Sequence, residues 1–293
     1  MENFIQLTVS GVMCGMVYAL IAMGIVLIYK ASGIFNFAQG ALVAIGSFFG
    51  YQLTMRVGLP LWLGIIATLA FAVLLGFLVE RLTLRPLIGQ PFFAAVMMTL
   101  ALGLAIDGVI VTIWGGEVRL FPIFPTLPIK LGPIVLSQEY VWSAAIAVAI
   151  FIIFTIFFRY TRAGLSMRGV AEDHQVARSL GVRVTTVFSQ TWIIATVVAA
   201  IGGILLGALN GVEFTMSVVA LVAFPVVLLG GLTSVGGLLI AGPIIGLSES
   251  LGSYYLDSII GGGSREVFPF LVMLIVLLLR PYGLFGLKTI ERI

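Results

Sequence analysis

The sequence predicts an all-α polytopic membrane protein, a transmembrane helical bundle of about eight or nine apolar segments in a single domain that covers residues 1–293. Hydrophobic residues make up 61% of the chain and charged residues only 9%, whereas soluble domains carry roughly 25% charged residues. The apolar residues also form runs long enough to cross a hydrocarbon core of roughly 30 Å. The 35 glycines and 11 prolines fit this class, because neighbouring transmembrane helices complete the hydrogen bonding around such residues.

Nine apolar runs follow one another along the chain. The first covers residues 5–29, and no Lys or Arg precedes it, so we interpret it as a retained span and not as a cleavable signal peptide. The run at 218–229 contains Pro225 and is followed by glycine pairs, which leaves both a full and a broken span open. The remaining runs lie at 34–53, 59–79, 92–114, 140–158, 187–209, 238–256 and 267–279.

Two polar stretches between the runs predict the orientation in the membrane. Residues 115–139 are rich in proline and predict an external loop, and residues 159–185 predict a cytoplasmic loop. With this arrangement 11 of the 15 Lys and Arg residues are cytoplasmic, which places the N-terminus outside and the C-terminus inside by the positive-inside rule. The cytoplasmic set is Lys30, Arg81, Arg85, Arg159, Arg162, Arg168, Arg178, Arg183, Arg280, Lys288 and Arg292, and the external set is Arg56, Arg119, Lys130 and Arg265.

The cytoplasmic loop contains a short amphipathic helical pattern. Acidic residues open the pattern and an arginine and a glycine close it, which is the charge order that a helix dipole favours. Three apolar residues of the pattern share one face at helical spacing. The residues are Glu172, Asp173, Val176, Ala177, Arg178, Leu180 and Gly181. Spacing alone leaves two interpretations open, a solvated loop and a docking helix for a soluble partner.

A weak internal repeat is consistent with this order and orientation of the apolar runs in the membrane. Aligning Gly40–Ala44 with Gly237–Ala241 also brings Leu84–Pro86 close to Leu279–Pro281. The two copies would be three-segment units that run in the same direction, although chance similarity among apolar helices is the alternative. Membrane transporters are often built from such repeats, with discontinuous helices beside the substrate path.

Catalytic and metal chemistry find little support in the composition. A single histidine, His174, and a single cysteine, Cys14, do not supply a metal site or a disulfide framework. No serine has a histidine and a carboxylate plausibly placed for a triad, and no Walker-type glycine loop precedes a Lys-Ser or Lys-Thr pair. We therefore predict no catalytic residues and no cofactor in this chain, and the scattered basic residues do not predict nucleic-acid binding.

Polar residues within the apolar runs are the candidates for a solute path. Asp107 and Glu249 lie inside predicted spans, where a charge costs at least ~2.5 kcal/mol on insertion scales. For Glu249 a structural hydrogen bond between helices is the favoured interpretation, and for Asp107 a packing role and a path role are equal. Asn36, Gln39 and Gly40 form a polar notch that either bonds between helices or lines the path. The candidate path residues are Asn36, Gln39, Gly40, Asp107, Gly230, Gly231, Gly237 and Glu249.

Four stretches of the sequence carry a family resemblance, and they extend over essentially the whole chain. They are GMVYALIAMGIVLIYKASGIFNFAQGAL, TRAGLSMRGVAEDHQVARSLGV, LLGGLTSVGGLLIAGPIIGLSESL and LLLRPYGLFG. In this order they resemble the permease subunits of branched-chain amino acid ABC importers, in particular the shorter of the two permeases. The most specific parts are NFAQG and AEDHQVARSLG.

The resemblance implies a permease of the bacterial or archaeal cytoplasmic (inner) membrane that forms half of a pore. It implies a second homologous permease, two cytoplasmic ATPases that bind ATP and Mg²⁺, and an extracytoplasmic solute-binding protein as partners, besides membrane lipid. It also implies that AEDHQVARSLG is the loop that docks into the ATPase. The residues expected to couple are Arg168, Glu172, Asp173, Val176, Ala177, Arg178, Leu180 and Gly181.

The sequence departs from the family pattern at a few positions, and the substrate remains open. Gln39 stands where family members often carry histidine, and Lys30 and Asp107 are charged at places where the family is expected to be less so. Related permeases carry urea, amides or aromatic acids. An autonomous channel or secondary carrier, and a membrane scaffold without transport, are the other function classes.

Overall fold

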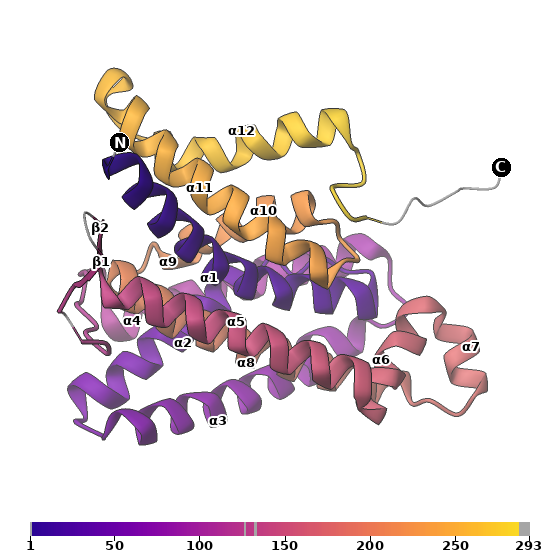
Figure 1. Ribbon diagram of the computed structural model, residues 1–293. Helices are drawn as coiled ribbons and strands as arrows, with labels where there is room; N and C mark the ends of the chain where they lie inside the picture. Colours follow the sequence, from indigo (N-terminus) through magenta and orange to yellow (C-terminus); the bar gives the residue numbers. More distant parts are fainter. Residues whose placement is uncertain (1, 126, 132–133, 287–293) are drawn as a thin grey trace. The chain divides into compact units, whose positions relative to one another are not determined.

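The computed structural model describes residues 2–125, 127–131 and 134–286, and within them the fold is all-α with one short β-hairpin. The helices, labelled in Figure 1, group into two compact units. The first unit contains Met1–Val26, Phe124–Val148 and Leu221–Ile293, and the second contains Leu27–Ile123 and Ala149–Ala220. Two long helices, α1 (Glu2–Ser32) and α5 (Gln138–Tyr160), contribute residues to both units.

In the first unit, the N-terminal part of α1 lies alongside α11, and α10 and α12 also contact α11 (Figure 1). The first residues of α5 follow an antiparallel hairpin in which Ile129 pairs with Leu136. Besides α1 and α5, the elements of this unit are β1 (Ile129–Leu131), β2 (Ile134–Leu136), α10 (Ala223–Gly230), α11 (Val235–Ile260) and α12 (Ser264–Leu279).

In the second unit, α8 is the central helix and contacts both α2 and α3. A π-helical turn at Gln52–Arg56 extends α2, and another at Glu80–Leu84 extends α3 and leads to a 3₁₀ turn at Arg85–Leu87. A further 3₁₀ turn, Ala220–Val222, follows α9. The helices of this unit are α2 (Gln39–Tyr51), α3 (Leu61–Val79), α4 (Phe92–Trp114), α6 (Arg162–Glu172), α7 (His174–Ser179), α8 (Val184–Asn210) and α9 (Met216–Val219).

Close helix contacts in both units depend on glycine. A Cβ atom at Gly15 of α1 would collide with the backbone carbonyl of Gly242 in α11. In the second unit, a Cβ atom at Gly203 of α8 would collide with the backbone carbonyl of Val43 in α2. Small residues at helix interfaces let backbones approach closely, which is the main source of packing energy where lipid replaces water.

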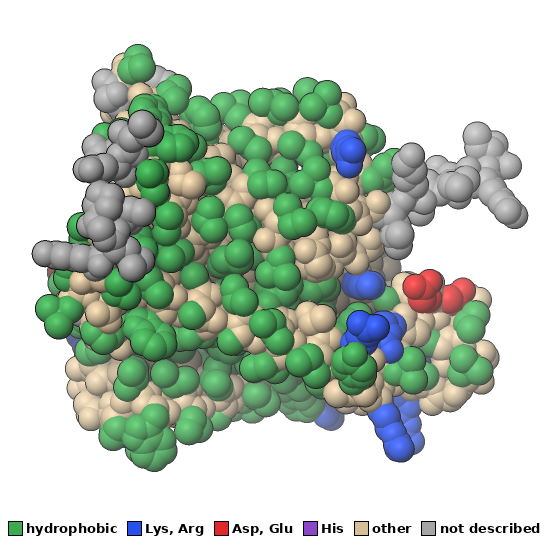
Figure 2. Space-filling view, viewed as in Figure 1, with side chains coloured by type: hydrophobic (Ala, Val, Ile, Leu, Met, Phe, Trp, Pro, Cys, Tyr) green, Lys and Arg blue, Asp and Glu red, His purple; other side chains and the backbone are tan. Residues whose placement is uncertain are grey.

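Burial differs strongly between the long helices. The most apolar 18-residue windows of α1 and α8 are 83% and 72% buried, whereas those of α3, α4 and α5 are 22–28% buried. These three helices therefore expose many large apolar side chains, and hydrophobic side chains are spread over the whole face shown in Figure 2. An exposed apolar surface of this extent requires lipid or a partner protein to cover it.

Every predicted apolar run overlaps a helical segment of the structure, although the run at 34–53 becomes helical only at Gln39. The run at 218–229 is divided between α9, a 3₁₀ turn and α10, which favours the broken alternative. The runs at 34–53 and 267–279 correspond to α2 with its π-helical extension and to α12. Among the described residues, the helices long and apolar enough to span a membrane are Phe4–Ser32, Leu61–Leu87, Phe92–Trp114, Gln138–Tyr160, Val184–Asn210 and Val235–Asp257.

The two predicted loops differ in structure. Residues 115–139 contain the β-hairpin and a segment in which Arg119 forms an isolated bridge with Val212. Residues 159–185 contain α6 and α7, and charged side chains gather over these two helices in Figure 2. Three residues used in the loop and orientation predictions, Pro133, Lys288 and Arg292, lie outside the described residues.

The internal repeat stays a prediction, but its two aligned glycines have similar surroundings. A Cβ atom at Gly40 of α2 would collide with the backbone carbonyl of Ser217 in α9. A Cβ atom at Gly237 of α11 would likewise collide with the backbone carbonyl of Gly230 in α10. Each glycine therefore begins a helix that packs against part of the segment Met216–Gly230, which agrees with the proposed alignment.

Candidate functional site

The predicted polar notch is a buried, hydrogen-bonded turn at the start of α2. Asn36 and Gln39 are 0% and 1% exposed. The Asn36 Nδ2 donates to Gln39 Oε1 at 3.0 Å, and Asn36 Oδ1 accepts from the backbone N–H of Ala38 at 3.0 Å. Asn36 thereby closes an Asx-type turn ahead of the helix. The notch places two amides in an apolar interior where both have partners.

Two elements from elsewhere in the second unit meet this turn. The Thr99 hydroxyl of α4 donates to the backbone carbonyl of Phe35 at 3.3 Å, and the backbone of Ser217 in α9 packs against Gly40. The Ser217 hydroxyl donates to Asp107 Oδ2 at 3.3 Å, while Asp107 Oδ1 is buried without a hydrogen-bond partner. The structure therefore brings four predicted path residues into one polar cluster, and it adds Thr99 and Ser217 to it.

The three predicted path glycines gather at the junction of α10 and α11 in the first unit. Gly230 ends α10 and contacts the backbone of Gly237 in α11. Gly231 has a φ of +97°, and a Cβ atom there would lie 2.5 Å from the backbone nitrogen of Gly286. The Ser234 hydroxyl caps α11 by accepting from the backbone N–H of Gly237 at 3.1 Å. A tight backbone junction separates α10 from α11.

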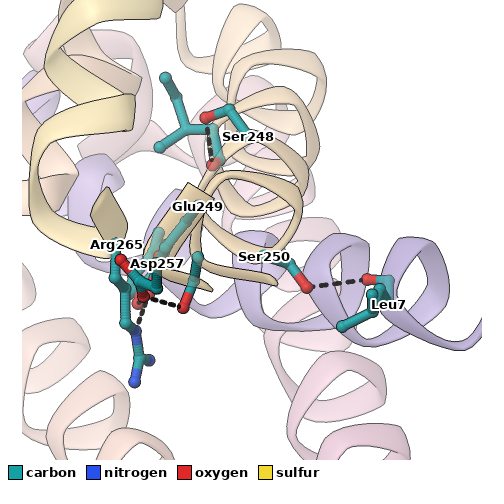
Figure 3. Close-up of polar contacts among 9 residues, drawn as sticks. Leu7, Ser248, Glu249, Ser250, Asp257 and Arg265 are labelled. Carbon is teal, nitrogen blue, oxygen red and sulfur yellow. Dashed lines mark hydrogen bonds and ion pairs between the residues drawn. The ribbon is translucent and has the colours of Figure 1, made fainter. Parts of the chain in front are cut away.

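Glu249 lies more than three turns further along α11, at the centre of a second polar cluster in the first unit. Its Oε1 accepts from Arg265 Nε at 2.5 Å and from the Tyr18 hydroxyl at 3.1 Å. Its other oxygen, Oε2, is buried without a partner. Figure 3 shows Arg265 of α12 directed toward Glu249, with Ser250 bonded to the Leu7 carbonyl of α1. The interhelical hydrogen bond predicted for Glu249 is present, and one of its donors is the positively charged Arg265 of α12.

The turn between α11 and α12 positions Arg265. Gly261, Gly262 and Gly263 have φ values of +90°, +118° and +86°, which L-residues with side chains rarely adopt. Asp257 then fixes the start of α12, because it accepts from the backbone N–H of Ser264 at 2.9 Å and from the Ser253 hydroxyl at 2.8 Å. This geometry holds the guanidinium of Arg265 against α11.

The predicted amphipathic helix is shorter than expected and is preceded by another helix. The expectation that Glu172 opens it is wrong, because Glu172 ends α6 and Asp173 adopts an extended conformation between α6 and α7. The Asp173 carboxylate caps α7 through the backbone N–H groups of Gln175 and Val176, at 2.6 and 3.0 Å. These hydrogen bonds, first that from Val176 and then that from Gln175, hold the pKa of the Asp173 carboxyl below its ordinary value of 3.8.

The C-terminal end of α7 follows the prediction. Gly181 has a φ of +85°, and its backbone N–H donates to the Arg178 carbonyl at 3.0 Å. The His174 ring nitrogen Nε2 lies 3.0 Å from the carbonyl of Ala31, and the Arg168 guanidinium donates to the carbonyl of Phe158. Through these contacts α6 and α7 are joined to the ends of α5 and α1, two helices long and apolar enough to span a membrane.

The structure divides the predicted apolar face of α7. Ala177 is 3% exposed and packs in a core cluster with Met167 of α6 and Val187 of α8. Val176 and Leu180 are 55% and 78% exposed. A residue one position from Val176 is rotated by about 100° around a helix, which explains why Ala177 turns inward while Val176 remains exposed. Leu180 lies beyond the last residue of α7, at its C-cap, and is also exposed.

Comparison with known proteins decides the family. The model for the permease component of the branched-chain amino acid transport system matches residues 7–278. The chain belongs to this permease family. It is therefore a multi-pass permease of the inner membrane, and its curated relatives are transport permeases.

Curated relatives match the permease over nearly its whole length. The high-affinity branched-chain amino acid transport system permease protein LivH of Escherichia coli (strain K12) is 30% identical, covering 99% of this chain and 98% of its own. BraD of Pseudomonas aeruginosa, a permease protein of the same description, is 26% identical, covering 99% and 98%. A probable LivH of Methanocaldococcus jannaschii is 29% identical, covering 94% and 90%.

A solved structure resembles the permease in fold. PsaBC from Streptococcus pneumoniae in complex with Fab matches with a TM-score of 0.53 at 12% identity, covering 94% of this chain and 91% of that chain. At this identity the likeness concerns the fold alone.

The described residues of the permease contain no group of three His, Cys, Asp or Glu side chains that could hold a metal ion.

Sequence reasoning missed several residues of the permease's polar clusters. Arg265 enters the sequence prediction only as one of the four external basic residues, whereas in the structure it pairs with Glu249. Tyr18, Thr99 and Ser217 lie in apolar or mixed stretches where one hydroxyl gives no periodic signal. The Gly261–Gly263 run was the available clue, because three successive glycines predict a sharp reversal that returns the following residues to the preceding helix.

Proposed function

We propose that this permease imports a branched-chain or other apolar amino acid and forms half of a translocation pore with a second homologous permease. The observation that carries the proposal is the match to LivH, which extends over 99% of this chain and 98% of the relative. A match over the full length includes the membrane helices as well as the cytoplasmic loop. Uncharged notch amides and a neutral ion pair also suit a solute without net charge.

In this proposal, two cytoplasmic ATPases drive the cycle and bind ATP and Mg²⁺ themselves. The helices α6 and α7 form the coupling surface, with Arg168, Glu172, Asp173, Ala177, Arg178 and Gly181 shaping it. The exposed apolar side chains of Val176 and Leu180 supply the contact. Apolar anchors surrounded by a polar rim are typical of protein interfaces.

The path is proposed to include both polar clusters and the glycine junction between α10 and α11. An external solute-binding protein would deliver the solute on the side of the N-terminus, and the C-terminus would be cytoplasmic. Gln39→Leu removes a buried amide and keeps its approximate volume. We expect it to reduce uptake while the ATPase still binds, whereas loss of ATPase binding would make Gln39 a packing residue.

Reconstituted transport tests the proposal. The permease is copurified with its native partners, the subunits are identified, and uptake of radioactive L-leucine into proteoliposomes is measured with and without ATP. We expect ATP-dependent uptake that requires the ATPases. Uptake by the permease alone would indicate an autonomous carrier, transport of urea, amides or aromatic acids in place of leucine would change the substrate, and no flux of any solute would indicate a scaffold.

A further inference from the structure

A polar cavity of about 240 Å³ lies in the first unit around Glu249 and Arg265. It is smaller than the roughly 300 Å³ at which pockets for drug-sized ligands begin, so it is suited to a small solute. Leu7 and Cys14 of α1, Tyr140 of α5 and Tyr254 of α11 form part of its wall, and serines form another part. The cavity thus has an apolar side, a hydroxyl-rich side and one charge of each sign.

The charges in this cavity are arranged asymmetrically. Glu249 is 6% exposed and has one oxygen, Oε2, that is buried without a partner. The Arg265 side chain is 51% exposed, although its Nε donates to Glu249. A buried carboxylate oxygen that lacks a donor is costly, so a closed structural pair would be expected to satisfy it. Oε2 has almost no accessible surface, so an incoming ammonium group would satisfy this oxygen once the Glu249 side chain turns toward the cavity.

We propose that this cavity binds the zwitterionic head group of an α-amino acid, with Arg265 holding the carboxylate and Glu249 the ammonium group. The inference rests on the proposed function and names its recognition site. A guanidinium recognises a carboxylate through two parallel N–H bonds, and the free Glu249 oxygen accepts from the ammonium. Because the two groups of an α-amino acid are attached to the same carbon, an adjacent Arg and Glu match them together.

The neutrality of the pair suits this substrate. Glu249 and Arg265 together carry no net charge, and neither does an α-amino acid zwitterion, so binding exchanges one ion pair for two without leaving a charge in the membrane. The cavity lies near the first turns of α1 and the start of α12, on the side that we predict to be external. A delivered solute would meet it early in transport.

Protection of a cysteine in the cavity tests the inference. Cys14→Ala removes the single cysteine of the chain, and Ser10→Cys then places a reporter in the cavity wall. Labelling by N-ethylmaleimide is measured on the permease copurified with its partners, with L-leucine, 4-methylpentanoate or 3-methylbutylamine raised to high concentration. These analogues lack the ammonium and the carboxylate, respectively. We expect leucine to slow labelling and neither analogue to do so.

Matched variants separate recognition from packing. Phe4→Cys, an exposed position of α1 outside the cavity, should label equally with and without leucine. Arg265→Gln and Glu249→Gln should remove the protection and raise the KM for uptake at least about tenfold, since a charge-assisted hydrogen bond contributes about this factor or more. Arg265→Lys keeps the positive charge next to Glu249 but loses the two parallel guanidinium N–H donors. This variant should fold normally, and leucine should protect its reporter cysteine less.

Several results would overturn the inference. These are no protection by leucine, equal protection by either analogue, or full protection in Arg265→Lys. Labelling reports binding without transport, so it is interpretable even if the assembled complex fails to take up leucine. Leucine uptake without protection of the reporter cysteine would refute the cavity as the amino-acid binding site and leave the proposed function intact. Protection without uptake would support the cavity as a binding site and count against the import of leucine.

Discussion

Replacing Val176 and Leu180 with serine should detach the ATPase from the permease. Complete burial of a Val or Leu side chain contributes ~1.5–3 kcal/mol, and 55% of Val176 and 78% of Leu180 remain exposed in this chain. Scaling by these fractions gives ~2–4 kcal/mol for the pair if the partner covers both. The double variant should therefore bind the ATPase about 30- to 1,000-fold more weakly.

The measurement is the Kd of the purified ATPase for the permease held in lipid nanodiscs. Leu120→Ser is the matched control, because Leu120 is 83% exposed and lies in the predicted external loop. This control should bind the ATPase like the unmodified permease, and all variants should insert and pair normally. A change of less than about threefold in the double variant would contradict the docking role of α7.

Three further predictions concern packing, capping and orientation. Gly15→Ala should destabilise the permease by ~1–3 kcal/mol in thermal unfolding, because its Cβ meets the backbone of α11, whereas Gly108→Ala, with open space around its Cβ, should be neutral or stabilising. Asp173→Ala should speed hydrogen exchange of the first α7 amides. In the unmodified chain the Asp173 cap stabilises α7 fully above pH 3.8, the ordinary pKa of the carboxyl, and this stabilisation is lost as the pH falls through the lower folded pKa. Exchange measured at neutral pH and in strong acid therefore checks that the cap stabilises α7 only when Asp173 is ionised. Cysteines at Leu120 and Ser179 should react with impermeant reagents from opposite sides of the membrane. Reaction of both from the same side would overturn the predicted orientation of the two loops.

The membrane helices were predictable because their signal is local. A run of about 20 apolar residues reports its own length and environment, so the segments at 92–114 and 187–209 match α4 and α8 closely. The cap residues Asp173 and Gly181 follow from local backbone chemistry too. Which neighbour a helix packs against depends on contacts between distant residues, such as Gly15 with Gly242, and periodicity does not encode these partners.

The short helix α7 shows where periodicity misleads at short range. Val176, Ala177 and Leu180 lie on one broad face by spacing, yet Ala177 packs inward against α6 and α8 while the other two remain exposed. Spacing within α7 does not show that α6 covers Ala177, because the direction of the chain at Asp173 decides which helix packs there. An extended residue there separates the two helices, so the exposed part of the face is a product of tertiary structure.

The pairing of Glu249 with Arg265 is the feature furthest from the reach of sequence reasoning. The bond between Asp257 and Ser264 places the start of α12 near the last turns of α11, so hairpin geometry alone would set Arg265 beside Leu256. Glu249 lies seven residues earlier, about 10 Å along the helix, and the side chain of Arg265 bridges this offset. A lysine would present a single ammonium without the fork of donors. The length and donor geometry of arginine thus connect the turn between α11 and α12 to a carboxylate buried within a candidate membrane span. Arg265→Lys preserves the charge, so it is the sharpest test of whether this contact recognises a solute or only joins two helices.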